Sequence, residues 1–551
     1  MIRAFWRAGS VGRVLRGTDE TGAVRRSIAG FLFFLIALVA YVLAAWRVLT
    51  APEDWLLQIV PDDTFYYLQI ARNLASLGRS TADGVTATNG YHPLWMAIAT
   101  SLASFRDGSE LLRGAVVTSF VLNVGAALML RTVLARLTTV EWAWTAAACW
   151  LLNPLAFLMA LQATEASMYA IALLMVLMLH LRLHAVSINK ASSPPSSRFL
   201  VVYGASLGGL CLARTEGIVI AGLAIGWCTR IAFTHRKDAR RALALVLVPV
   251  ALAAIVMLPW FLFSLSQVGT IVQDSGVMKA LWVADEYPGL AGKLRNLIDT
   301  ADYLVGTTLR LMTTWNASKR LLLVICVLFA AVIGTVLVRR ARPDHVRVLT
   351  TVLAPALTLG VIYGTLLGER QIWWLVVPCL TIFFISAISV FVCVDLVSRD
   401  RRLHMGVQAG LVFASLAIFI GAQREPYLPY PWQPAVKHTQ AAFEKMVPSS
   451  ERIGCFNAGI PMFFGAGRVI ALDGLVNHEA RVAWTQRRFE AFLAEKRVRF
   501  IADEQRAVNR AFRFSRVRPS LRERASYPLP GWATGRRVLW EVVPPVVQAA
   551  F

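Results

Sequence analysis

The sequence predicts an all-α polytopic membrane protein with a small α/β domain at its C-terminal end. Of its 551 residues, 57% are hydrophobic and only 16% are charged, whereas soluble proteins keep about a quarter of their residues charged. Apolar runs of about 17–24 residues recur, and this length crosses a bilayer. The net charge is +23, but the basic residues lie mostly between the apolar runs. The composition excludes a soluble enzyme and a disulfide-stapled secreted domain, and it favours membrane topology over nucleic-acid binding.

About eleven transmembrane helices are expected within a membrane domain at 29–421, together with re-entrant or interfacial helices. Residues 1–28 are rich in arginine, so we expect this basic N-terminus to stay in the cytoplasm. Every loop on the same side is then basic, and the C-terminus lies outside. The expected spans are 29–49, 112–134, 141–161, 167–184, 199–213, 217–234, 241–263, 321–338, 347–367, 372–394 and 405–421.

Three segments on the outer side are too long to be simple turns. They are residues 50–111, 264–320 and 422–551. Within the first, 93–105 is apolar but too short for an ordinary span, so we expect a re-entrant or interfacial helix. A full span there would change the helix count and the side of several loops. The last segment is predicted to be an extracytoplasmic α/β domain, with strands at 452–456, 468–472, 498–502 and 538–543 and a helix at 486–495.

Two adjacent carboxylates, Asp62 and Asp63, follow the first span. From Asp63 onward, apolar residues recur at spacings of three and four, which predicts an amphipathic helix on the membrane surface. Two interpretations stay open. The pair either caps this helix and complements its dipole, or it supplies a general base or ligands for a divalent metal such as Mg or Mn.

Further polar residues are expected on the same side of the membrane. His92 follows the Asn89-Gly90 turn signal and is either structural or a phosphate or proton contact. Lys279 is either an ordinary solvated lysine or a phosphate contact. The ends of predicted spans carry Glu165, Arg214, Glu216 and Arg370.

These span-end residues have two interpretations. They are either plain boundary charges with a local Arg214–Glu216 pair, or the lining of a polar cavity in which arginine clamps a phosphate.

The order of these motifs resembles the GT-C superfamily of integral membrane glycosyltransferases. The segments Pro61–Tyr67 and Thr88–Trp95 look like a bacterial branch related to protein mannosyltransferases and aminoarabinose transferases. Gln273 stands where this resemblance leads us to expect proline. The resemblance covers nearly the whole chain, and it includes Glu165, 213–217, 269–279, the loop of Arg370, 457–460 and 471–477.

The resemblance implies an inverting glycosyltransferase of the bacterial inner membrane. A polyprenyl-phosphate-linked sugar would be the donor, and a glycan, lipid or protein on the extracytoplasmic face would be the acceptor. Arg370, with Lys279, would hold the phosphate. One of Asp62 and Asp63, preferably Asp63, would deprotonate the acceptor, with a divalent metal as an alternative role for the pair.

Three other functions are weighed against this one. An O-antigen ligase or polymerase would place its polar residues in a large mid-chain loop. A lipid-linked-glycan transporter or flippase would show paired charges near the membrane midplane and matched broken helices. A pure scaffold would not need the outward carboxylates.

Overall fold

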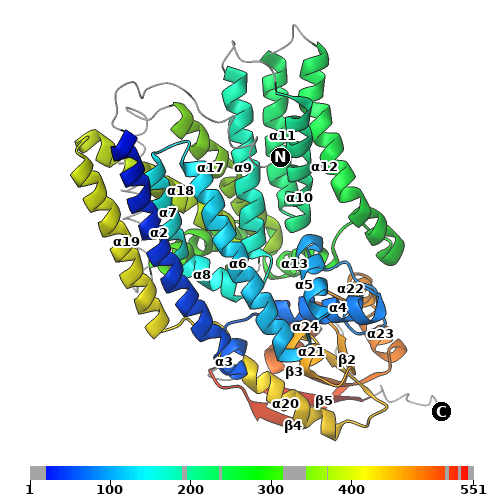
Figure 1. The fold of residues 1–551 in the computed structure, drawn as a ribbon. Helices are drawn as coiled ribbons and strands as arrows, with labels where there is room; N and C mark the ends of the chain where they lie inside the picture. Colours follow the sequence, from blue (N-terminus) through cyan, green and yellow to red (C-terminus); the bar gives the residue numbers. More distant parts are fainter. Residues whose placement is uncertain are drawn as a thin grey trace, which may run out of the picture.

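The computed structural model describes residues 20–188, 195–234, 239–313, 343–368, 370–515, 520–531 and 535–543. Long helices form a bundle, and a small α/β domain built from the C-terminal residues covers one end of it (Figure 1). The predicted fold class is therefore confirmed: the chain is a polytopic membrane protein with a C-terminal α/β domain.

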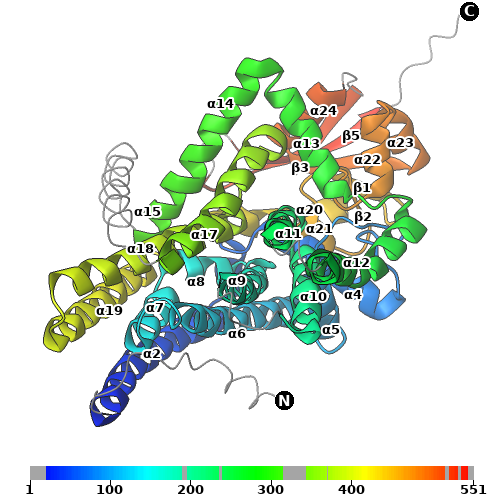
Figure 2. The same ribbon diagram turned by 90° about the horizontal axis from the view of Figure 1, so that it is seen from above.

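Seven helices among the described residues are long and apolar enough to cross a membrane. An eighth span is formed if the bent pair α7 (Val140–Leu151) and α8 (Pro154–Leu161) is counted as one. Figure 2 shows several bundle helices end-on. The helices that contain the seven spans are α2 (Glu20–Leu49), α6 (Gly108–Leu134), α9 (Ala166–Ile188), α12 (Ala239–Val268), α17 (Pro343–Ile362), α18 (Val376–Val397) and α19 (Arg401–Arg424).

The outward faces of these helices are apolar, as a lipid environment requires. On α2, Leu43 and Trp46 are 64% and 67% exposed, whereas Tyr41 is buried. Helix α10 (Ser197–Ala213) packs closely on α12, because a Cβ at Gly204 would lie 2.7 Å from the Pro249 backbone. Small residues allow such close approach where lipid supplies no hydrophobic driving force.

The predicted spans coincide with helices except at two places, although those at 199–213 and 217–234 fall on helices shorter than the seven spans. The span 321–338 lies outside the described residues. The span 141–161 was expected to be one helix, but it is bent by 54° between α7 and α8. The Asn153 side chain accepts hydrogen bonds from Leu155 N and Ala156 N and so starts a new helix, and Pro154 occupies its first turn.

The two long predicted segments within the membrane domain contain short helices at the domain-covered end of the bundle. Residues 93–105 form helix α5 (Pro93–Ala103), shorter than an ordinary span, as expected. Figure 2 shows α13 and α14 meeting at a sharp turn. The other short helices here are α3 (Glu53–Leu57), α4 (Asp62–Leu77), α13 (Asp274–Glu286), α14 (Gly289–Ala301), a π-helical turn (Asp302–Thr307) and α15 (Thr308–Thr313).

The C-terminal domain is a five-stranded mixed sheet with strand order β2-β1-β3-β5-β4. Strand β1 (Arg452–Cys455) runs parallel to β2 (Val469–Ala471) and β3 (Val498–Glu504), and β5 (Arg536–Val543) pairs antiparallel with β3 and β4 (Ser520–Pro528). All four predicted strands are present; β4 was not predicted. The helices of this domain are α20 (Gln433–Met446), α21 (Gly459–Phe464), α22 (His478–Thr485), α23 (Phe489–Glu495) and α24 (Gln505–Ser515).

Helix α4 belongs to the hydrophobic cores of both parts. Its Phe65 packs in the core of the bundle and also contacts Phe463 and Phe464 of α21. Its Tyr66 and Ile70 pack in a second core with residues of the sheet, including Ile453. The sequence predicted that this helix lies on the membrane surface. In the structure it is instead packed between the bundle and the C-terminal domain.

Candidate active site

Asp62 fastens the C-terminal domain to helix α4. Its carboxylate accepts hydrogen bonds from the backbone N–H groups of Gly459 (2.9 Å) and Ile460 (2.8 Å), at the start of α21. A Cβ at Gly459 would lie 2.2 Å from the Asp62 carbonyl oxygen, so this close approach requires glycine. The expected cap of α4 itself is not formed. Asp62 instead caps a helix that is distant in the sequence, because the C-terminal domain docks on the first turn of α4.

Tyr66 makes a second link, one helical turn further along α4. Its hydroxyl donates to Asp473 Oδ2 (2.7 Å) and accepts from the backbone N–H of Ala458 (2.9 Å). Asp473 follows β2, and Glu504 ends β3. These carboxyl groups therefore gather at the carboxyl ends of the parallel strands, where ligands commonly bind in open α/β sheets.

Burial raises the pKa values of three carboxyl groups at this junction. The pKa of Asp62 rises to about 7, that of Asp473 to about 8 and that of Glu504 to about 9. Removal from water is the largest cause for each, and the neighbouring carboxyl groups add to it. The site is therefore able to hold and release protons near neutral pH.

Stability is expected to fall as the pH rises through this range. The pKa of Asp473 is about 8 in the folded protein against an ordinary value of 3.8, so the folded state keeps a proton that the unfolded chain releases. The free energy of unfolding then decreases from about pH 4 to 8, by up to about 1.4 kcal/mol per pH unit for one group. Between pH 5 and 8 the melting temperature should change less with pH for Asp473→Asn than for the wild type. An equal dependence on pH in the two proteins would contradict the raised pKa of Asp473.

A cavity of about 270 Å³ lies where α4, α13 and the connection between α10 and α11 (Gly217–Thr234) meet, and is here called the bundle cavity. Trp373, Trp374 and Tyr67 form part of its wall. Six of the eight residues that the sequence singled out line it, which the sequence order alone does not require. They are Asp63, His92, Glu165, Arg214, Glu216 and Lys279.

Arg214 is held by two glutamates and a backbone carbonyl. Its Nη1 lies 2.7 Å from Glu165 Oε1 and 3.0 Å from the Trp373 carbonyl oxygen. Its Nε and Nη2 donate to both carboxylate oxygens of Glu216, at 3.1 and 2.7 Å. The predicted local Arg214–Glu216 pair is thus present, and Glu165 extends it. With its planar fork already engaged and its side chain only 2% exposed, Arg214 builds the cavity wall.

Lys279 is the cation of the bundle cavity that remains available. The described residues offer it no hydrogen bond or ion pair, and its Nζ lies 5.5 Å from the centre of the Trp374 ring. His92 places its Nε2 3.7 Å from Glu165 Oε1, and its buried Nδ1 has no partner. Burial lowers the pKa of His92, so its ring is neutral at pH 7. The cavity therefore has unused capacity for an anion and for hydrogen bonds.

Arg370 lines neither this cavity nor the next. Its Nη2 donates to Asn296 Oδ1 (3.0 Å) and lies 3.6 Å from Asp299 Oδ2, both on α14. Its neighbours do reach the site, because Trp373 and Trp374 line the bundle cavity. A phosphate contact by Arg370 thus stays a prediction that this geometry does not favour.

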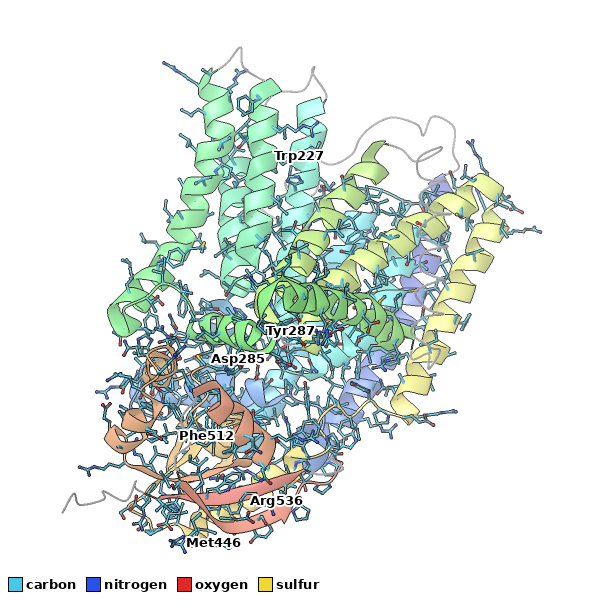
Figure 3. All side chains as sticks on the ribbon, turned by 180° about the vertical axis from the view of Figure 1, so that it is seen from behind. Trp227, Asp285, Tyr287, Met446, Phe512 and Arg536 are labelled. Atoms are coloured by element: carbon cyan, nitrogen blue, oxygen red, sulfur yellow. The ribbon has the colours of Figure 1, made fainter. Side chains whose placement is uncertain are left out.

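A second cavity, of about 680 Å³, opens between α13 and the sheet and is here called the domain cavity. Figure 3 shows Asp285, one of its lining residues, between the bundle and the C-terminal domain. Asp62, Asp473 and Glu504 line this cavity. Asp63 lines both cavities. The Asp63 carboxylate therefore stands at their junction.

The remaining sequence motifs tie the walls of the two cavities together. The Asn89 side chain donates to Ser264 Oγ (2.7 Å) and accepts from the backbone N–H of Asp274 (3.1 Å). The buried Asp274 accepts from Arg481 Nε (2.8 Å), on α22 of the C-terminal domain. A Cβ at Gly90 would lie 2.0 Å from the Leu475 carbonyl oxygen. Three segments far apart in the sequence thus form one frame.

The side chain of Gln273 links two segments of this frame. Its amide Nε2 donates to the Tyr91 carbonyl oxygen (2.6 Å), and its Oε1 accepts from Thr215 Oγ1 (2.6 Å). Proline, which the resemblance led us to expect at this position, has no side chain able to make either bond.

The metal interpretation finds too few ligands in the described part of the chain. No group of three or more His, Cys, Asp or Glu residues is placed there to hold an ion. Both carboxylate oxygens of Asp62 already accept backbone N–H groups.

Solved structures resemble this chain along most of its length. ArnT from Cupriavidus metallidurans bound to undecaprenyl phosphate superposes with a TM-score of 0.55 and 14% identity, covering 93% of this chain and 98% of that one. The apo state of the same protein superposes with a TM-score of 0.53 and 14% identity, covering 92% of this chain and 98% of that one. The Archaeoglobus fulgidus oligosaccharyltransferase in complex with Zn and sulfate superposes with a TM-score of 0.50 and 13% identity, covering 88% of this chain and 69% of that one. The sequence matches no protein-family model and no curated protein.

The chain has the GT-C fold.

Within this GT-C fold, the C-terminal domain contributes carboxyl groups that the sequence did not predict. Asp473 lies in a segment that carried the resemblance, but no role was assigned to it. Glu504 follows directly after a predicted strand, and strand ends are a usual place for ligand contacts. Its position at the end of β3 was therefore the signal that could have found it.

Proposed function

We propose that the chain is a GT-C glycosyltransferase that moves a sugar from a polyprenyl-phosphate donor to an acceptor hydroxyl. The observation that carries the proposal is the position of Asp63, whose side chain lines both cavities. A base at such a junction contacts a donor on one side and an acceptor on the other. The undecaprenyl phosphate in the ArnT structure of the same fold supports the choice of donor.

The donor lipid would lie along the bundle. An apolar cavity of about 260 Å³ is lined by α9, α11 (Gly217–Thr234), α17 and α18. Its lining adjoins that of the bundle cavity on two helices, since Ile220 follows Val219 on α11 and Pro355 lies one turn from Leu359 on α17. The polyprenyl tail would occupy the apolar cavity, and its phosphate would meet Lys279.

The reaction would be a single displacement with inversion. Asp63 takes the proton of the acceptor hydroxyl, and the acceptor oxygen attacks the anomeric carbon of the sugar. The bond from that carbon to the phosphate oxygen breaks, and its electron pair leaves with polyprenyl phosphate. The ammonium of Lys279 stabilises the negative charge that grows on this phosphate.

Replacing Lys279 by methionine is expected to weaken donor binding by at least about tenfold, because a charge-assisted hydrogen bond is lost. The measurement is the affinity of the purified protein in nanodiscs for undecaprenyl phosphate. Lys293→Met is the matched control, since Lys293 is exposed on α14 and lines neither cavity. An unchanged affinity of Lys279→Met would remove Lys279 from the donor site.

We place the C-terminal domain on the extracytoplasmic face, because the basic loops lie at the other end of the bundle. Alkaline phosphatase fused after Phe551 should be active. The same reporter inserted at 235–238, between α11 and α12, should be inactive. The opposite pattern would put the cavities on the cytoplasmic face and exclude the proposed donor geometry.

A further inference from the structure

The domain cavity is acidic in a strongly basic chain. Among the residues that the structure describes, its wall carries six carboxyl groups and one basic residue, Arg506, although the chain as a whole has a net charge of +23. The excess of carboxyl groups is therefore local to this cavity. The six carboxyl groups belong to Asp62, Asp63, Asp285, Glu286, Asp473 and Glu504.

Glu504 has hydrogen-bonding capacity that the protein does not use. The residue is only 6% exposed and lines the cavity. Asp62 and Asp473 both accept hydrogen bonds, but the Glu504 carboxyl has no hydrogen bond or ion pair with any residue that the structure describes. Its side chain borders the open space of the cavity, so a ligand bound there is the partner that remains open to it.

The arrangement suits a molecule rather than a metal ion. In the described ranges, no three ligating side chains converge on one point, so the carboxyl groups surround a space of about 680 Å³. Trp282, Phe456 and Trp484 supply aromatic walls between them. Aromatic faces attract cations as well as apolar ring faces.

We propose that the domain cavity binds an amine-bearing saccharide, whose ammonium group is held by Glu504 while its hydroxyl meets Asp63. This inference rests on the proposed function in naming that saccharide the acceptor. A neutral sugar of the same shape lacks the charge that the carboxyl groups complement, and an anionic acceptor would be repelled by them.

Proton exchange accompanies binding. Burial raises the pKa of Glu504 to about 9, so the group is a neutral acid in the empty cavity at pH 7. An ammonium beside it favours the carboxylate, and the proton leaves to solvent. Glutamine has the size of the neutral acid but cannot ionise. The substitution Glu504→Gln therefore tests the charge and leaves the shape in place.

The experiment compares two disaccharides on the full-length protein in nanodiscs at pH 7, without any lipid donor. The dimer of glucosamine carries amines where cellobiose carries hydroxyl groups, and the two share one ring skeleton. We expect the wild type to bind the glucosamine dimer at least about tenfold more tightly than cellobiose. Glu504→Gln should lose this preference. Glu495→Gln, on the exposed face of α23, should keep it.

Equal affinities of the wild type for the two sugars, or binding of neither, would overturn the inference. A preference that survives in Glu504→Gln would also overturn the inference, because a residue other than Glu504 would then bind the ammonium group of the sugar. Undecaprenyl phosphate binding is titrated separately against Lys279→Met. A wild-type protein that shows no sugar preference but binds the donor normally refutes this inference alone, whereas failure of donor binding refutes the proposed function and leaves the sugar result standing.

Discussion

Replacing Asp63 by asparagine is expected to lower the rate of sugar transfer by about 10²–10⁴-fold, the range that general base catalysis contributes. Asparagine keeps the size of the side chain but cannot accept a proton. Because Asp63 stands where the two cavities meet, the loss should appear in kcat while the affinity for the lipid phosphate changes little. The measurement is single-turnover transfer by the purified protein with a polyprenyl-phosphate sugar.

Two variants make this result specific. Asp54→Asn changes a half-exposed carboxylate of α3 that lines neither cavity, so its rate should stay at the wild-type value. Asp62→Asn should instead lower the melting temperature, because the amide cannot accept both N–H groups at the start of α21. Wild-type transfer by Asp63→Asn would end the proposed mechanism.

Replacing Arg214 by methionine is expected to destabilise the protein by about 3–5 kcal/mol, because it leaves buried charge without compensation. The guanidinium joins Glu165 on one side to Glu216 on the other. Neither carboxylate has access to enough water to replace it, since their side chains are 2% and 12% exposed. Thermal unfolding in detergent measures the loss.

The triple variant Arg214→Met/Glu165→Gln/Glu216→Gln should recover much of that stability, because it removes the charges together. Arg240→Met, at an exposed position on α12, should leave the melting temperature almost unchanged. A single Arg214→Met variant as stable as the wild type would show that the three residues are boundary charges.

The fold was largely predictable because its signals are local. Apolar length and the alternation of short strand patterns mark helices and strands within a few residues of their observed bounds. The failures also have local causes. Asn153 and Pro154 break one span by capping and by a missing N–H. Strand β4 is an exposed edge strand that carries the consecutive charged residues Arg522, Glu523 and Arg524. It therefore lacks the alternation of apolar and polar residues from which a strand is predicted.

The candidate site was predictable in its membership but not in its geometry. Charged residues at span ends are rare enough to attract notice, and three of the four share one cavity with Asp63, His92 and Lys279. Which side chain is engaged and which is available depends on contacts across the chain. Arg370 pairs with α14, Arg214 is saturated by glutamates, and Lys279 is left to meet an anion. The domain cavity was missed because its carboxyl groups come from α4, α13 and the ends of two strands, which are far apart in the sequence.

The last strand of the chain lies inside the sheet, between β3 and β4. When the described membrane helices have been synthesised, the strand that completes the sheet has not yet been made. Until then Tyr66 and Ile70 of α4 lack the sheet residues with which they form the second core. The five-stranded sheet is thus complete only once β5 has been made. A chain truncated before Arg536 would carry the membrane helices but lack the strand that joins β4 to β3.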